Sequence, residues 1–192
     1  MTNFTIIGTG NMGSAIGGVL AAGGSDVTHV TREQVGSAPL TGDVVILAVP
    51  HSAIDDIIAA YGDQLAGRTV VDITNPLDFA TFDSLVVPAG GSSAAELQAK
   101  LPGSKVLKAF NTNFAATLES KLIGGLPTTV LVAGDDADAK STLIAAVEAG
   151  GVSALDAGSL SRAHELEALG FLQLTLAASE KIAWTAGYAV VR

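Results

Sequence analysis

A strand, a glycine turn and a helix follow one another in residues 5–20, TIIGTGNMGSAIGGVL. An apolar run over residues 4–7 leads into glycines spaced G-x-G-x-x-G, and apolar residues then recur at helical intervals. A strand that turns tightly into a helix is the context in which this spacing marks a dinucleotide-binding unit. The flanking pattern therefore favours a dinucleotide site over the alternative that the glycines only turn a corner.

The three glycines of the turn have different expected tasks. Gly8 lets the chain turn sharply off the strand, Gly10 leaves room for a pyrophosphate beside the backbone, and Gly13 lets the helix pack closely on the strand. The free N–H groups and the positive dipole end of the helix attract the anion. The expected pyrophosphate site is Gly8, Thr9, Gly10, Asn11, Met12 and Gly13.

Length and composition predict the fold class. The chain has 192 residues, of which 48% are hydrophobic and 15% are charged. We expect one NAD(P)-binding domain over residues 1–192, with its core at about 1–112 and C-terminal strands and helices over 113–192. The fold class is α/β: a Rossmann-like, doubly wound, mainly parallel sheet with a short C-terminal helical extension. The apolar balance indicates surface that is buried against a second subunit, so we expect a homodimer.

Several classes of protein are disfavoured. The net charge of −9 argues against a nucleic-acid partner, which would need a basic surface. The longest apolar region, residues 166–191, is interrupted by polar and charged residues, so we expect no membrane insertion. The first strand begins by residue 4, which leaves no room for a signal peptide, and the chain has no cysteine. We therefore expect a cytoplasmic enzyme.

The residues after the second strand, residues 27–30, indicate which nicotinamide nucleotide binds. An NAD site would place an acidic residue here to bind the ribose 2′-hydroxyl. This strand ends instead in Thr31 and Arg32, a hydroxyl and a guanidinium that suit a 2′-phosphate. We therefore expect NADP. The alternative is that Glu33 binds the hydroxyl and that Arg32 is an ordinary surface cation.

The link between the second and third strands is too short for a helix. Ten residues, 33–42, separate the second strand from the apolar strand over residues 43–49. Ten extended residues reach only about 33 Å, and returning along a seven-residue strand uses about 23 Å of that. The second strand is therefore expected at the edge of the sheet.

Three further strands are expected to end at the same crevice, because ligands bind beyond the carboxyl ends of parallel strands. These are residues 43–49, 69–73 and 105–110. Asn75 could bind a carboxamide or a ribose, or could be a turn asparagine, and His51 could touch a ligand or be solvated. The expected crevice residues are Ala48, Val49, Pro50, His51, Asn75, Pro76, Ala109, Phe110 and Asn111.

Helix boundaries follow from capping residues. Ser52 and Asp55 resemble a capping box that opens a helix to about residue 65, and Ser92 or Ser93 caps a helix to residue 101. Asp135 and Asp136 are expected N-caps of a helix over residues 137–149. The remaining expectations are a loop over residues 77–91, strands over 128–133 and 152–155, and a long helical region over 159–186.

No side chain is assigned a catalytic role, and no metal site is expected. The sequence holds no recognisable triad or cluster of metal ligands. His164 and Glu165 could face a hydride acceptor, but a solvated helix surface is the favoured interpretation. His29 lies within the second strand and is expected to be structural.

These motifs together resemble a known family. The segments are GTGNMGSAIG, Thr-Arg after the second strand, AVP, VVDITNP, VLKAFNT, VAGDD and DAGSL followed by ELE. In this order they resemble the deazaflavin (factor 420)-dependent NADP oxidoreductases, and they are also similar to the NADPH-binding domain of membrane ferric reductases. The resemblance implies a commonly dimeric Rossmann-type protein that moves hydride between NADP(H) and a deazaflavin or flavin. It implies that Gly8–Gly13 hold the pyrophosphate, that Thr31 and Arg32 hold the 2′-phosphate, and that residues 48–51, 75–76 and 109–112 line the nicotinamide side.

Two alternative functions stay open at this point. A reductase of a small imine or carbonyl substrate would share the glycine turn but would need a large helical domain, whereas only about 80 residues follow Asn111. A redox sensor would bind NADPH without turning it over.

The resemblance also implies a partner, which is a small-molecule hydride acceptor.

Overall fold

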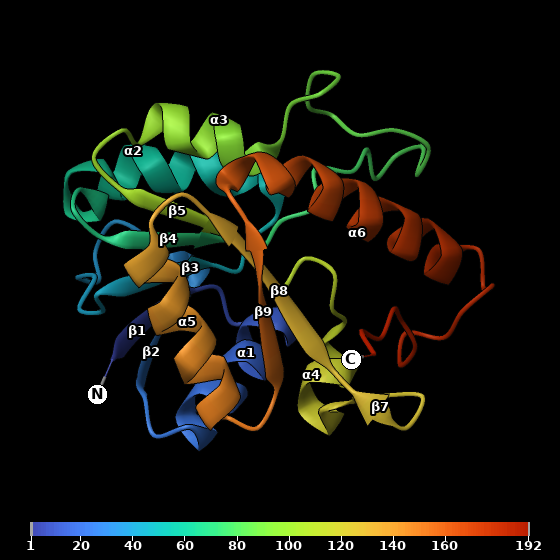
Figure 1. Cartoon of the computed structure of the whole chain (residues 1–192). Coiled ribbons are helices and arrows are strands. Elements are labelled where there is room, and N and C mark those ends of the chain that lie inside the picture. Colours follow the sequence, from blue (N-terminus) through green and yellow to red (C-terminus); the bar gives the residue numbers. More distant parts are fainter. Residues whose placement is uncertain (1, 192) are drawn as a thin grey trace.

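A seven-stranded sheet forms the centre of the protein, as a computed structural model that describes residues 2–191 shows (Figure 1). The strand order is β2-β1-β3-β4-β5-β8-β9. The first five of these strands in space are mutually parallel, β8 runs antiparallel to β5, and β9 is parallel to β8. The strands are β1 (Asn3–Ile7), β2 (Asp26–Val30), β3 (Val44–Leu47), β4 (Thr69–Asp72), β5 (Lys105–Lys108), β8 (Thr129–Gly134) and β9 (Ser153–Gly158), with a separate hairpin of β6 (Leu122–Ile123) and β7 (Leu126–Pro127). The expected α/β class with a mainly parallel sheet is confirmed.

Helices cover both faces of the sheet, which makes three layers (Figure 1). One face is covered by α1 (Asn11–Ala22), α4 (Ala115–Ser120) and α5 (Ala137–Ala149). The other is covered by α2 (Ile54–Leu65), α3 (Ser93–Lys100) and the start of α6 (Ala163–Ala178). Three short 3₁₀ turns, η1 (Arg32–Gln34), η2 (His51–Ala53) and η3 (Leu160–Arg162), complete the elements. Among residues 2–191, no helix combines the length and the hydropathy that crossing a bilayer requires.

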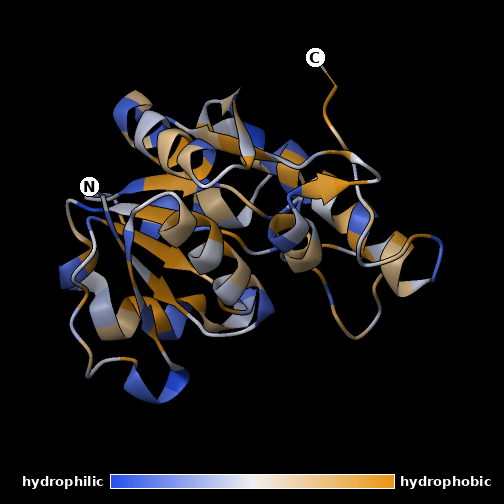
Figure 2. Ribbon diagram, turned by 90° about the horizontal axis from the view of Figure 1, so that it is seen from below, coloured by the Kyte–Doolittle hydropathy of each residue, from blue (hydrophilic) through white to orange (hydrophobic). Residues whose placement is uncertain are grey.

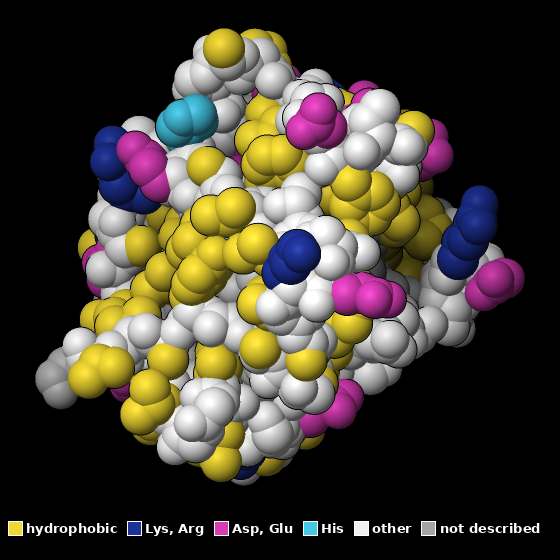
Figure 3. Space-filling view, turned by 90° about the vertical axis from the view of Figure 1, so that its right-hand side faces the viewer, with side chains coloured by type: hydrophobic (Ala, Val, Ile, Leu, Met, Phe, Trp, Pro, Cys, Tyr) yellow, Lys and Arg dark blue, Asp and Glu magenta, His cyan; other side chains and the backbone are white. Residues whose placement is uncertain are grey.

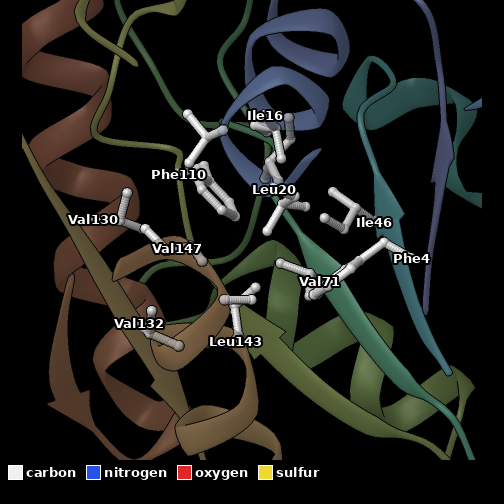
Figure 4. Packing of buried hydrophobic residues seen from close by; sticks show 14 of the residues in the cluster. Phe4, Ile16, Leu20, Ile46, Val71, Phe110, Val130, Val132, Leu143 and Val147 are labelled. Carbon is white, nitrogen blue, oxygen red and sulfur yellow. The ribbon is translucent and has the colours of Figure 1, made fainter. Parts of the chain in front are cut away.

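The apolar residues of the central strands build a core on each side of the sheet. All four residues of β3 are buried, as a strand covered on both faces requires. Figure 4 shows Phe4, Ile46 and Val71 from the strands packing against Leu20 and Leu143 from α1 and α5. The central strands are hydrophobic in Figure 2, and many polar residues lie on the outer parts of the helices and in the loops.

The edge position of β2 is confirmed. β2 pairs with β1 alone, and β1 pairs on its other side with β3. The link between β2 and β3 contains only the 3₁₀ turn η1 and then follows the sheet, where the Gly42 N–H donates to Thr5 Oγ1 at 2.9 Å. A link this short cannot also hold a helix.

Two capping predictions need correction. The α2 helix begins at Ile54 after η2, and its N-cap Ala53 has no side-chain hydrogen bond, so the expected capping box at Ser52 is absent. Asp136 caps α5 by accepting from the Ala139 N–H at 2.8 Å, as predicted, but Asp135 accepts from the Leu160 N–H at 2.9 Å instead. Of the two serines proposed for α3, Ser92 is the cap and accepts from the Ala95 N–H.

The long helical region predicted over residues 159–186 is wrong at its C-terminal end. The α6 helix ends at Ala178, and the chain then turns back without regular structure. Glu180 adopts a left-handed conformation, with φ of 59°. The Lys181 N–H donates to Leu176 O at 2.8 Å and the Glu180 N–H to Ala177 O at 3.0 Å, which is a Schellman closure of the helix. Glycine usually occupies this position, so a glutamate here carried no stop signal in the sequence.

Candidate functional site

The glycine turn between β1 and α1 has almost no space for side chains on its inner side. Gly8 has φ of 120°, and a Cβ added there would lie 2.1 Å from Ala48 O. A Cβ on Gly13 would lie 2.5 Å from Gly8 O, so neither position accepts a larger residue. A Cβ on Gly10 would meet nothing within 4 Å. The turn is thus tightly packed below and open at Gly10, the position at which a phosphate would approach the backbone.

The start of α1 offers backbone donors at this open position. Gly10 is the N-cap and supplies no side-chain hydrogen bond. The first hydrogen bond of the helix runs from the Ser14 N–H to Gly10 O at 2.9 Å. The N–H groups of Asn11, Met12 and Gly13 therefore have no acceptor within the helix and suit an anion.

The end of β2 places a hydroxyl, a guanidinium and a carboxylate close together. The Thr31 hydroxyl donates to Glu33 Oε2 at 2.8 Å, and the Thr31 N–H donates to Gln34 Oε1 at 2.9 Å. The backbone N–H of Glu33 and the Thr31 hydroxyl hold the pKa of the Glu33 carboxyl below its ordinary value. Arg32 is exposed beside them. The end of β2 therefore holds a candidate group for each nucleotide: Arg32 for the 2′-phosphate of NADP and Glu33 for the ribose 2′-hydroxyl of NAD.

A cleft of about 370 Å³ opens at the carboxyl ends of β4 and β5, a size typical of small-molecule sites. Its floor holds Asn75 and Asn111, which were predicted from the sequence. The Asn75 Nδ2 group donates to Asn111 O at 2.8 Å, and Asn111 Nδ2 donates to Asn75 Oδ1 at 2.9 Å and to Leu166 O at 2.8 Å. The cleft is lined by Asn11, Met12, Ile73, Asn75, Phe110, Asn111, Asn113, Phe114, Ala115, Ala116, Leu174 and Trp184.

Gly170 lets α6 approach this amide pair. A Cβ on Gly170 would lie 2.2 Å from Asn75 Oδ1 and 2.9 Å from Asn111 Nδ2. Gly170 lies inside α6 and provides the close contact with the cleft floor.

Of the other residues predicted to line the crevice, some lie at the site and others lie in the core. Ala48 packs within 3.4 Å of the Cβ positions of Gly8 and Gly13, so it supports the glycine turn. Val49 and Pro50 are half-buried or exposed at the end of β3, and Pro76 follows Asn75 in a buried position. Ala109 is completely buried in the core. Phe110 lines the cleft with φ of 63°, a conformation that is uncommon for a bulky residue and often found at functional sites.

Behind the cleft lies a buried ionic network that the sequence analysis did not identify. Lys108 Nζ is 3.0 Å from Asp72 Oδ2 and 2.8 Å from Glu167 Oε1, and all three side chains are at most 1% exposed. Lys108 also donates to Thr74 O, and the Ser93 N–H donates to Glu167 Oε2 at 2.9 Å. The network therefore ties β4, β5, α3 and α6 together just below the cleft.

The pKa directions in this network follow from burial and from the shared ammonium. Burial acts to raise the pKa of Asp72, but the charge of Lys108 and the hydrogen bonds from Thr74 outweigh it and hold the pKa below its ordinary value. Burial raises the pKa of Glu167, and Lys108 and the Ser93 N–H only partly offset that rise.

The sequence carried a signal for this buried network. Two apolar strands, VVD and VLK, each end in a charged residue. The strands pair Asp72 directly with Lys108.

The histidines lie outside the cleft lining. His51 is half-buried, and its Nδ1 lies 3.0 Å from Ser93 Oγ, which in turn is 3.1 Å from Thr74 Oγ1. His29 Nδ1 lies 3.3 Å from Gly8 O, which supports its predicted structural role. His164 Nδ1 lies 3.1 Å from Gly91 O.

The sequence comparisons identify relatives among reductases, although no family model matches the chain. The chain is 37% identical over 132 residues to an F420-dependent NADP reductase of Methanocaldococcus jannaschii, which is 67% of this chain and 59% of that protein. It is 30% identical to the F420-dependent NADP reductase of Methanothermobacter thermautotrophicus over 82% of this chain and 70% of that protein. It is also 33% identical to the metalloreductase STEAP3 of Rattus norvegicus over 72% of this chain and 26% of that protein.

Solved structures agree with the sequence comparisons. A candidate F420-dependent NADP reductase of Arthrobacter sp. FB24 matches with a TM-score of 0.85 and 25% identity over the whole of both chains. A pyrroline carboxylate reductase of Plasmodium falciparum matches with a TM-score of 0.57 at 11% identity, which shows the shared fold alone. The matched part of this chain spans 59% of the M. jannaschii reductase and 26% of the rat protein. With 30% identity over 70% of the M. thermautotrophicus reductase, the chain belongs to the F420-dependent NADP reductase family.

Proposed function

We propose that this protein is an NADP(H)-dependent oxidoreductase that transfers hydride between NADPH and a deazaflavin or flavin. The observation that carries the proposal is the position of the cleft, which is lined both by Asn11 and Met12 of the glycine turn and by Asn75 and Asn111 at the strand ends. A nucleotide whose pyrophosphate lies at the start of α1 can therefore extend its nicotinamide into this cleft. The names of the family members support the choice of NADP and of a deazaflavin.

The residues present fit the nucleotide. The open space at Gly10 and the free N–H groups of α1 would hold the pyrophosphate, and Thr31 and Arg32 would hold the 2′-phosphate. Asn75 and Asn111, which fix each other by hydrogen bonds, would orient the nicotinamide ring. The nucleotide supplies the hydride when it is bound, and the protein's part is to align the two rings and to exclude water.

The chemistry of the lining supports a ring acceptor over a small anionic substrate. The cleft lining among residues 2–191 contains asparagine, apolar and aromatic side chains but no charged one. A reductase of a small carboxylate-bearing imine or carbonyl needs a cation to bind the carboxylate. Lys108, behind the cleft, is fully buried and paired with two carboxylates. The imine or carbonyl alternative is therefore disfavoured.

A homodimer is part of the proposal. Hydrophobic side chains gather on the side of the molecule formed by α6, the C-terminal segment and the β6–β7 hairpin (Figure 3). Leu122, Leu126 and Leu172 are between 44% and 49% exposed there. Exposed apolar surface of this kind is typical of subunit contacts. Light scattering coupled to size-exclusion chromatography tests the dimer.

Stopped-flow mixing of the protein with NADPH and either F420 or a flavin tests the proposed reaction. An enzyme oxidises the nucleotide over repeated turnovers, and we expect this result. A redox sensor would bind NADPH in calorimetry but would not oxidise it with either acceptor. That result would replace the enzymatic proposal with the sensor alternative.

A further inference from the structure

The segment after α6, residues 179–191, returns toward the cleft. The Schellman closure at Glu180 reverses the chain at the end of α6. The segment then runs back beneath α6 toward α4, as Figure 1 shows. This path brings Trp184, the single tryptophan of the sequence, to the wall of the cleft.

Trp184 packs on one aromatic side chain and leaves much of its own surface free. Its ring lies 4.9 Å from the ring of Phe114, centroid to centroid, at an interplanar angle of 54°. Phe114 is 7% exposed, whereas Trp184 is 53% exposed. An indole of this size is usually buried, so an aromatic surface that is held in place at a cleft mouth suits a planar ligand.

Other residues of the cleft lining carry groups that complement the edge of a ring. The lining includes Asn11, Asn75, Asn111 and Asn113. The side-chain oxygens of Asn111 and Asn113 are buried and have no hydrogen-bond partner among the described residues. A ligand whose ring edge carries N–H groups would supply the missing donors, while one of its faces would meet Trp184.

We infer that Trp184 is a specificity-determining residue of the acceptor site, where it stacks on a flat, fused aromatic ring such as that of a deazaflavin or flavin. This inference rests on the proposed function, because it assigns the acceptor to the outer part of the cleft and the nicotinamide to the part beside Asn11 and Met12.

The test combines binding and turnover for four proteins: wild type, Trp184→Ala, Trp184→Phe and Phe79→Ala. Phe79 is a matched control because it is an aromatic residue that is 60% exposed but does not line the cleft. Trp184→Ala should raise the KM for F420 by about tenfold, since base–aromatic stacking of this kind has that strength. Trp184→Phe should recover most of the loss, and Phe79→Ala should leave the KM within about twofold of wild type. Calorimetry should show an unchanged Kd for NADPH in all four.

Fluorescence supplies a readout that does not depend on turnover. Because the chain has one tryptophan, its emission reports Trp184 alone. Titration of the NADP-loaded wild type with F420 or riboflavin should quench this emission to saturation, and Trp184→Phe should serve as the blank.

The outcomes separate the inference from the proposed function. Hydride transfer with no quenching and an unchanged KM in Trp184→Ala would overturn the inference and leave the proposed function intact. Saturable quenching without hydride transfer would support the ring site and overturn the proposed reaction. Equal losses of NADPH and F420 binding in Trp184→Ala would show a structural role and would also overturn the inference.

Discussion

Asn75 and Asn111, at the ends of neighbouring strands, hold each other through two hydrogen bonds. Asn75 Nδ2 donates to the backbone oxygen of Asn111 at 2.8 Å, and Asn111 Nδ2 donates to Asn75 Oδ1 at 2.9 Å. Each amide is thereby fixed by the other, and the third bond from Asn111 to Leu166 O ties both to α6. These hydrogen bonds hold the floor of the cleft in one arrangement, which the proposed alignment of two rings requires.

Gly170→Ala tests this arrangement. The new Cβ would lie 2.2 Å from Asn75 Oδ1, so the amide pair or the helix must shift. We expect the free energy of unfolding to fall by about 1–3 kcal/mol and hydride transfer to slow by about tenfold or more. Gly18→Ala is the matched control, because a Cβ on Gly18 in α1 meets nothing within 4 Å. The control should stabilise the protein slightly, by up to about 1 kcal/mol. Stabilisation of Gly170→Ala to the same degree, with unchanged kinetics, would contradict the prediction.

Arg32→Ala tests the nucleotide preference. Loss of a guanidinium on the 2′-phosphate should weaken NADPH binding by about 10- to 100-fold, because charge-assisted hydrogen bonds have that strength. NADH binding should change little, and Glu33→Gln should leave the preference for NADPH unchanged or increase it. Calorimetry with both nucleotides measures the ratio. Arg162→Ala, which removes another exposed arginine, is the control. Equal losses of the two nucleotides in Arg32→Ala would refute the assignment.

Lys108→Met tests the buried network. The substitution leaves Asp72 and Glu167 buried without their shared cation, and breaking a buried pair in this way costs about 3–5 kcal/mol. Urea unfolding should show a loss of this size. Lys100→Met removes an exposed partner of Asp55 and should change stability by less than about 1 kcal/mol. Adding Asp72→Asn and Glu167→Gln to Lys108→Met should recover part of the stability. Similar small losses in both lysine variants would show that the network contributes little.

Acidification should destabilise the protein. Three aspartates have a lowered pKa in the folded state. Burial acts to raise the pKa of Asp72, but Lys108 outweighs it. The Ala139 N–H lowers the pKa of Asp136, and Lys140 lowers that of Asp156. An aspartate whose pKa is lowered in the folded state stabilises the fold at pH values above 3.8, its ordinary pKa. This stabilisation is lost as the pH falls through the pKa of the folded state. The raised pKa of Glu167 acts in the opposite direction, because its ionised form is penalised by burial.

Thermal melting between neutral pH and about pH 3 measures this dependence. We expect the melting temperature to fall mainly below about pH 4, where aspartates take up protons. Asp136→Asn should flatten the acid limb relative to wild type, because one of the linked groups no longer titrates. A melting temperature that rises steadily toward pH 3 would contradict the prediction.

The sheet order near the N-terminus could be predicted because its signals are local or are set by chain length. The glycine spacing placed the turn between β1 and α1, and the ten-residue link after β2 placed that strand at the edge. The amides at the strand ends were predicted for the same reason, since parallel strands bring their carboxyl ends to one side. The antiparallel direction of β8 was not predicted, because an apolar strand carries no signal of its direction.

The sequence by itself determined the strand, glycine turn and helix at the N-terminus, the amides of the cleft floor and the family resemblance. Only the tertiary structure decided that Lys108 shares two buried carboxylates, that Gly170 makes room for Asn75, and that Trp184 returns to the cleft after a helix that ends at Ala178. The physical reason is the range of the interactions. Turns, caps and periodicity act between neighbours in the chain, whereas a buried charge, a close helix contact and a chain reversal at Glu180 depend on residues that meet only after folding.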